Sequence, residues 1–70
     1  MIQVVYDSNG EKLGAYEGDS DFCQVYDING NYIGKWSGHE IFYKDGNSLG
    51  YFYGYIEEAV KKLVVYSMLH

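Results

Sequence analysis

Hydrophobic and polar positions follow one pattern three times along the chain. The stretches VYDSNGEKLGAYEG, VYDINGNYIGKWSG and IFYKDGNSLGYFYG begin at Val5, Val25 and Ile41 and align on their glycines. In each copy a second glycine follows the first after four residues and a third follows after four more, and these positions hold all nine glycines of the chain. Self-similarity of this kind is the sequence signature of an internal structural repeat.

A short polar turn lies inside each copy. Asp7 and Asp27 stand three residues before the first glycine, and Asn9, Asn29 or Asp45 stands directly before it. This order fits a type I turn followed by a glycine with positive φ, because aspartate accepts hydrogen bonds from turn amides and glycine adopts positive φ without a steric penalty. Each copy is therefore predicted to be a β-hairpin, so the aspartates are explained by the turn rather than by carboxylate chemistry. The predicted hairpins span about residues 2–18, 22–38 and 39–54.

The turns also predict which side chains face each other across each hairpin. Aliphatic pairs of this kind favour cross-strand packing. The expected pairs are Val5 with Leu13, Val25 with Ile33, and Ile41 with Leu49. On the other sheet face, the second strand of each copy alternates glycine, aromatic, glycine, with Tyr16, Trp36 or Phe52 in the middle. A large ring flanked by glycines indicates that another group packs closely over it: a neighbouring hairpin's ring, another subunit or a ligand.

The hydrophobic period changes after the third hairpin. Apolar residues from Ile56 to Val64 recur at helical spacing, and Glu57 and Glu58 each precede a lysine by four residues, the favoured order for helical ion pairs. The sequence predicts one C-terminal helix over about residues 55–69, covering one face of the sheet. The predicted fold is thus a single, mainly β domain over residues 1–70, with six strands in three repeated antiparallel hairpins and one C-terminal α-helix.

The repeated line YDxNGxxIGxWxG, together with IFYKDGNSLGYF, resembles the four-fold β-flower repeat domain. In that family, short hairpins with a glycine turn and a glycine–aromatic ending are arranged around a pseudo-symmetry axis. The likeness covers about residues 4–55, but this chain has three hairpins instead of four and a helix at its end. A fainter likeness to the YD repeats of RHS proteins lies in Tyr6-Asp7 and Tyr26-Asp27. The β-flower family has no established activity, so neither likeness implies a catalytic residue.

Charge and composition narrow the range of partners. The formal net charge is −5, and arginine is absent. Without a basic patch or an arginine fork, the sequence does not favour nucleic-acid binding. An acidic surface either meets a basic partner or keeps the protein in solution. The start MIQVVYDSNG has no basic segment before its short apolar run, and the stretch AVKKLVVYSML is too short and too charged to span a bilayer. We therefore expect neither a signal peptide nor a membrane partner.

Small size leads to the expectation of a homo-oligomer. A chain of 70 residues is marginally stable alone, and its single cysteine, Cys23, excludes an internal disulfide. One lone thiol also suits a reducing compartment, so a cytoplasmic location is expected. The glycine–aromatic face would be hard to bury without another subunit, which favours self-association.

Catalytic and metal sites have weak support in the sequence. Cys23 and His39 could form a nucleophile–base pair, but a third orienting group and an oxyanion site cannot be placed. No ligand pair has zinc-site spacing, and Asp19-Ser20-Asp21 lacks the later glycine and the closing glutamate of a calcium loop. We expect no enzyme activity, no metal and no cofactor.

Aromatic residues are the best candidates for a binding surface. Tyr51, Tyr53 and Tyr55 alternate along one strand and so share a face, yet the first copy has no aromatic residue where Lys35, Tyr51 and Tyr53 stand. Rings that the repeat does not require serve either packing and subunit contact or a ligand, which they would grip by stacking. The candidate binding residues are Trp36, Tyr16, Phe52, Tyr51, Tyr53 and Lys35.

Two functional hypotheses follow. The first is a small, acidic, self-associating, non-enzymatic module that binds another macromolecule. Small acidic proteins of this kind are common in phages and other mobile elements, sometimes as inhibitors of host proteins, so an inhibitor or adaptor of a host protein is one form of this hypothesis. The alternative is a protein that binds or sequesters a small molecule such as a nucleotide between subunits, with the aromatic residues lining the site and Lys35 meeting an anion.

Overall fold

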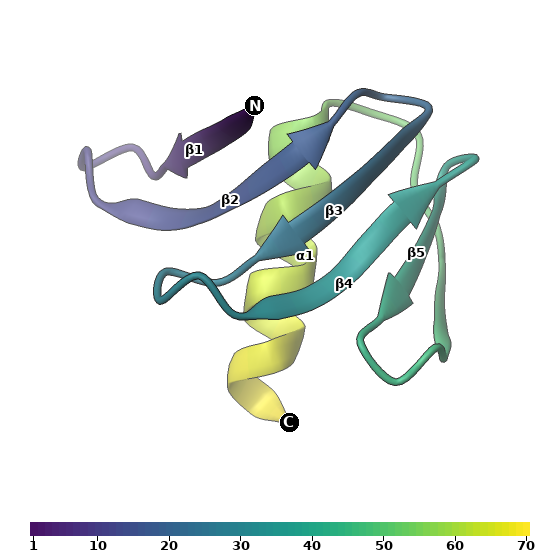
Figure 1. The fold of residues 1–70 in the computed structure, drawn as a ribbon. Helices are drawn as coiled ribbons and strands as arrows, with labels where there is room; N and C mark the ends of the chain where they lie inside the picture. Colours follow the sequence, from purple (N-terminus) through teal and green to yellow (C-terminus); the bar gives the residue numbers. More distant parts are fainter.

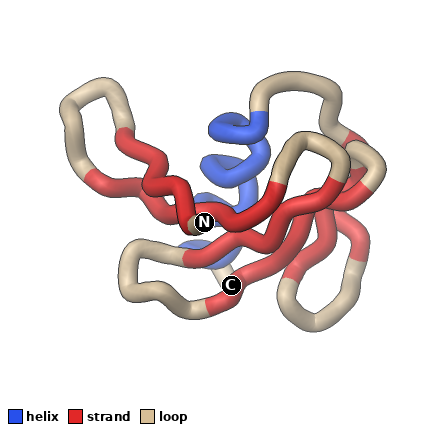
Figure 2. Tube along the Cα trace, turned by 45° about the horizontal axis from the view of Figure 1, so that its top comes forward, coloured by secondary structure: helices blue, strands red, loops and turns tan.

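One antiparallel sheet and one helix make up the protein in a computed structural model that describes residues 1–70 (Figure 1). The strands are β1 (Ile2–Tyr6), β2 (Lys12–Gly18), β3 (Phe22–Tyr26), β4 (Tyr32–Ser37), β5 (Glu40–Tyr43) and β6 (Ser48–Tyr51). Each strand pairs only with its neighbours along the chain, in the order β1-β2-β3-β4-β5-β6. The helix α1 (Ile56–Leu69) crosses one face of this sheet (Figures 1 and 2). The predicted fold class, with three successive hairpins and a C-terminal helix, is confirmed.

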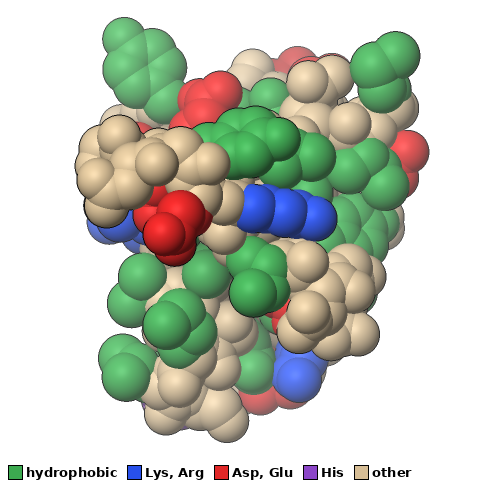
Figure 3. Space-filling model, turned by 90° about the vertical axis from the view of Figure 1, so that its left-hand side faces the viewer, with side chains coloured by type: hydrophobic (Ala, Val, Ile, Leu, Met, Phe, Trp, Pro, Cys, Tyr) green, Lys and Arg blue, Asp and Glu red, His purple; other side chains and the backbone are tan.

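The two edges of the sheet differ in their side chains. β1 forms one edge, and hydrophobic side chains make up much of the surface on that side of the molecule (Figure 3). β6 forms the other edge and leads into the segment that connects the sheet to α1.

The hairpin turns have the hydrogen bonds that the sequence predicts. In the second hairpin, the backbone amide of Gly30 donates to the carbonyl oxygen of Asp27 at 3.1 Å, and the Asp27 carboxylate accepts from the amides of Asn29 and Asn31, both at 2.9 Å. Asp7 has the same role in the first hairpin, whereas in the third Asp45 accepts from the amide of Asn47 at 3.0 Å. The turn glycines all have positive φ: Gly10 at 80°, Gly30 at 84° and Gly46 at 89°.

The predicted cross-strand pairs are wrong by one residue. Each hairpin has a β-bulge after its turn, so that the second strand carries one extra residue opposite the first. The observed pairs are Val5 with Gly14, Val25 with Gly34, and Ile41 with Gly50. The extra residue in each copy is the aliphatic residue that was predicted to pair with the first strand, namely Leu13, Ile33 or Leu49.

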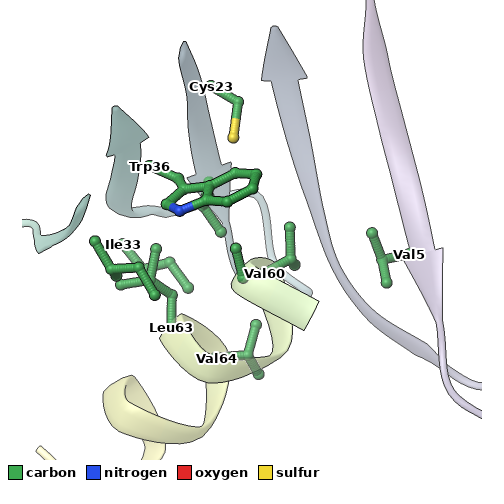
Figure 4. Close-up of a cluster of buried hydrophobic side chains, with 10 residues drawn as sticks. Val5, Cys23, Ile33, Trp36, Val60, Leu63 and Val64 are labelled. Atoms are coloured by element: carbon green, nitrogen blue, oxygen red, sulfur yellow. The ribbon is translucent and has the colours of Figure 1, made fainter. Parts of the chain in front are cut away.

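This bulge places the glycines, the rings and the aliphatic residues on the same sheet face, which α1 covers. Ile33 and Trp36 are 3% and 1% exposed and belong to one core with Val60 and Leu63 of the helix (Figure 4). The glycines let the helix approach closely, because a Cβ atom at Gly34 would lie only 2.7 Å from Cδ2 of Leu63. The prediction that the rings and the aliphatic residues lie on opposite sheet faces is therefore wrong, and so is the argument that the glycine–aromatic face needs another subunit to bury it. The helix of the same chain covers that face.

Candidate functional site

Trp36 and Lys35, two of the predicted binding residues, lie on opposite faces of the sheet. Trp36 is in the core beneath α1, while the Nζ atom of Lys35 lies 5.1 Å from the centre of the Phe42 ring. Successive residues of a strand point to opposite faces, so these neighbours cannot line one pocket. The predicted site in which Lys35 joins Trp36 is not formed.

Tyr16 is also separated from the other candidate rings. It lies on β2, with three strands between it and β6, and it packs half-buried against the core. Burial first, and then the nearby Glu57 and Cys23, raise the pKa of the Tyr16 hydroxyl. Tyr16 thus supports the contact between the sheet and the helix.

The remaining candidates gather around the end of β6. Tyr51 and Tyr53 have nearly parallel rings, with an interplanar angle of 10° and centroids 6.5 Å apart. The His39 ring stacks on Tyr53, with the two ring centroids 4.8 Å apart and the ring planes tilted by 23°. We call His39, Tyr51 and Tyr53 the tyrosine–histidine stack. Tyr51 and Tyr53 are 65% and 73% exposed, so the stack faces solvent.

The core anchors this stack. The His39 ring packs nearly perpendicular to the buried Trp36 ring, with a centroid distance of 5.8 Å, and the Trp36 ring also packs on Phe52, 6.1 Å away. Phe52 in turn lies beneath the Nζ atom of Lys62 on the helix, 5.0 Å from the ring centre. A continuous run of rings therefore leads from solvent to the centre of the core.

Local backbone geometry explains why the stack forms. The amide of Phe52 donates to the carbonyl oxygen of His39 at 2.7 Å, so strand-like pairing continues past β6 and Tyr53 falls on the same side as Tyr51. Gly38 and His39 connect β4 to β5, with φ of 57° and 70°, as a two-residue type I′ hairpin turn requires. His39 is the one residue other than glycine with positive φ. The prediction that Tyr51, Tyr53 and Tyr55 alternate along one strand is only partly right. β6 ends at Tyr51, the Tyr53 ring still lies beside that of Tyr51, and Tyr55 instead stands directly before α1.

Sequence reasoning missed His39 as a member of this group. His39 was expected only as a partner for Cys23 or as a metal ligand, although Ser37-Gly38-His39-Glu40 between two apolar stretches is a signal for a tight turn. Such a turn brings the residue after the glycine next to the strand that pairs with β5.

A carboxylate without a cationic partner borders the stack. Glu40 pairs with Tyr51 across β5 and β6, and its Oε2 atom accepts a hydrogen bond from the Ser48 hydroxyl at 2.6 Å. No lysine or histidine lies within ion-pair distance of Glu40. The charge of Glu40 raises the pKa of the Tyr51 hydroxyl, so the tyrosine stays neutral and the local charge is negative.

The geometry does not assemble a nucleophile or a metal site. Cys23 is fully buried and points toward the Trp36 ring, and burial raises the pKa of its thiol to about 11 (Figure 4). Since the thiolate is the reactive form, this cysteine is inert in the folded protein. No three His, Cys, Asp or Glu side chains come close enough together to hold a metal ion. Asp19 instead caps its turn by accepting hydrogen bonds from the amides of Asp21 and Phe22.

The surface hollows lie elsewhere. One follows the exposed side of α1, and two lie between α1 and the first two hairpins, lined in part by Leu13, Val64 and Glu57. None of the six predicted binding residues lines them. The helix is too short and too polar to cross a membrane.

Comparisons with known proteins give no match. No protein-family model matches the chain, and neither the curated proteins nor the solved structures include one that matches.

Proposed function

We propose that this protein is a small, non-enzymatic binding module that recognises a positively charged segment of another protein through the tyrosine–histidine stack. The observation that carries the proposal is the exposed, parallel pair of rings of Tyr51 and Tyr53 beside the Glu40 carboxylate, which has no cationic partner.

The first support for the proposal is that the Tyr51 and Tyr53 rings are exposed and have no role in packing the core. The core is complete without the Tyr51 and Tyr53 rings, which leave more than half of their surface in solvent. Tyr53 stacks on His39 and Tyr51 stacks on Tyr53, which holds the rings in place, so little side-chain freedom remains to be lost on binding. Tyrosines of this kind are enriched at the centres of protein interfaces.

Charge is the second support and indicates the partner's chemistry. The faces of tyrosine rings attract cations, and a guanidinium group can stack on a ring while it forms hydrogen bonds to a carboxylate. Glu40 provides that carboxylate, and the net charge of −5 favours the approach of a basic partner. An arginine side chain satisfies both features of the site at once.

A titration with a defined probe tests the proposal. The peptide Gly-Arg-Gly, added to the labelled protein, is expected to shift the NMR signals of Tyr51, Tyr53 and His39 first. The same peptide with citrulline in place of arginine has nearly the same shape without the charge, and it should produce much smaller shifts. An exposed cation–π contact contributes about 0.5–1 kcal/mol, so Tyr53→Ala should weaken the peptide about two- to fivefold.

Tyr55→Ala is the matched control, because Tyr55 is 80% exposed and lies outside the stack. It should leave the affinity for the peptide unchanged. With a whole partner protein, loss of a central interface tyrosine costs about 2 kcal/mol, or about thirtyfold in Kd. Equal shifts at acidic residues all over the surface, or unchanged affinity in Tyr53→Ala, would show that the stack is not the binding site.

A further inference from the structure

β1 leaves one edge of the sheet open. Its outward-facing backbone N–H and C=O groups have no partner strand, because β2 pairs with it on one side only. Such an edge is a template for another strand unless charges, proline or a covering segment block it. Residues 1–6, MIQVVY, contain no charged side chain and no proline.

The side chains of β1 that point away from α1 are apolar and exposed. Ile2, Val4 and Tyr6 are 56%, 41% and 60% exposed, whereas Val5 points into the core. Val4 continues an apolar row across the sheet, since it pairs with Ala15, which in turn pairs with Tyr26. Hydrophobic side chains accordingly gather on this side of the molecule (Figure 3).

The opposite edge does not share these properties. β6 has four residues instead of five, and the Ser48 hydroxyl at its start is bonded to the charged Glu40. Burying that carboxylate against another strand would be costly unless the partner supplied a cation.

We infer that β1 is a dimerisation edge, on which β1 of a second copy of this chain pairs antiparallel about a two-fold axis at Val4. In that register Val4 faces Val4 of the other copy, and Ile2 faces Tyr6. Both pairs are apolar and lie on the exposed sheet face, so the edge is complementary to itself, as a two-fold interface requires.

Charge does not oppose a second copy at this edge. Two chains that each carry a net charge of −5 repel each other over most of their surfaces. The β1 strand has no charged side chain, and in this register the Met1 ammonium, 3.5 Å from Glu17, lies opposite Asp7 of the other copy, so two copies can meet there without opposing like charges. The basic partner proposed for the tyrosine–histidine stack would gain nothing from an uncharged edge, and the dimer uses none of the stack residues.

Mass in solution gives the first test. Light scattering on the intact chain over a concentration series should show the mass rising from 8.0 kDa toward twice that value. Val4→Lys sets two lysines opposite each other and should hold the mass at that of one chain. Tyr32→Lys is the matched control, because Tyr32 is 40% exposed on the same sheet face but lies on a central strand. It should dimerise as the wild type does.

A charge-swap experiment tests the register itself. Val4→Glu should also be monomeric, but an equimolar mixture of Val4→Lys and Val4→Glu should recover the dimer, since lysine then faces glutamate. Circular dichroism checks that each variant is folded. If a charge at this position prevents folding, Val4→Cys serves instead. Directly opposed residues of antiparallel strands have Cα atoms about 4.5–5.5 Å apart, which suits a disulfide.

Mild oxidation of Val4→Cys should therefore link two chains, while Tyr32→Cys should stay unlinked. A wild-type protein that remains monomeric at every concentration, or a dimer that Val4→Lys does not disturb, would overturn the inference. Tyr53→Ala should leave the mass unchanged, so failure of the dimer and failure of the binding proposal are distinguishable.

Discussion

Replacement of Gly34 by alanine tests how closely α1 packs on the sheet. The added Cβ atom would lie 2.7 Å from Cδ2 and 3.2 Å from Cδ1 of Leu63, and it would also crowd the carbonyl oxygen of Phe42. Leu63 is fully buried among the core side chains, and the Phe42 oxygen is a backbone atom of the neighbouring strand β5. The helix or the strand must therefore move.

The expected loss is large for a domain of this size. An extra carbon in a well-packed core costs about 1–3 kcal/mol. Stability of about 0.05–0.15 kcal/mol per residue gives the 70-residue chain about 3.5–10 kcal/mol in all. With a urea dependence of about 1 kcal/mol per M, the unfolding midpoint should fall by about 1–3 M.

A second glycine separates the helix contact from backbone strain. Gly50 occupies the corresponding position of the third hairpin, has φ of 105°, and has no atom within 4 Å of an added Cβ. Gly50→Ala should cost about 1–2 kcal/mol through the left-handed conformation alone. The expected stability losses of Gly34→Ala and Gly50→Ala overlap in size. The two substitutions are therefore distinguished by whether the loss changes when Leu63 is also replaced.

Leu63→Val supplies that comparison, because it removes the δ carbons that the new methyl group would strike. Gly34→Ala should be at least about 1 kcal/mol less damaging in the Leu63→Val background, whereas Gly50→Ala should be additive with it to within about 0.5 kcal/mol. Fluorescence of Trp36, the one tryptophan and 1% exposed, reports the urea unfolding. If Gly34→Ala and Leu63→Val are also additive, the helix does not press on this glycine.

Two further predictions concern the core. Leu63→Asp should unfold the protein or cost at least about 4 kcal/mol, because it buries an unpaired charge, and a normal circular dichroism spectrum with an unchanged midpoint would contradict the packing of α1. Since the pKa of the Cys23 thiol is raised from 9.0 to about 11, the folded state keeps a proton that the unfolded state releases. The stability that this thiol contributes is complete below about pH 9 and falls as the pH rises toward 11, so Cys23→Ala should lose less stability over that range than the wild type. Urea unfolding midpoints of the two proteins that fall equally between pH 9 and 11 would refute the raised pKa.

The tyrosine–histidine stack was only partly predictable. Tyr51 and Tyr53 are two positions apart on a predicted strand, which is enough to place them on one face. His39 reaches Tyr53 only because β5 and β6 pair and the Gly38–His39 turn projects the ring beside them. That contact joins residues 14 positions apart in the chain, and no repeating pattern in the sequence predicts it.

The sequence by itself determined the turns, the strand order and the helix. Asp27 and its neighbours complete their hydrogen bonds within five residues, so the hairpin forms from local chemistry, and short turns leave successive strands no arrangement but side-by-side pairing. Only the tertiary structure decided which face each ring occupies. One bulge residue in each hairpin shifts the register by one, and a shift of one exchanges the faces of a strand. The sheet and α1 then bury Trp36 and Ile33 together, because that arrangement removes the most apolar surface from water.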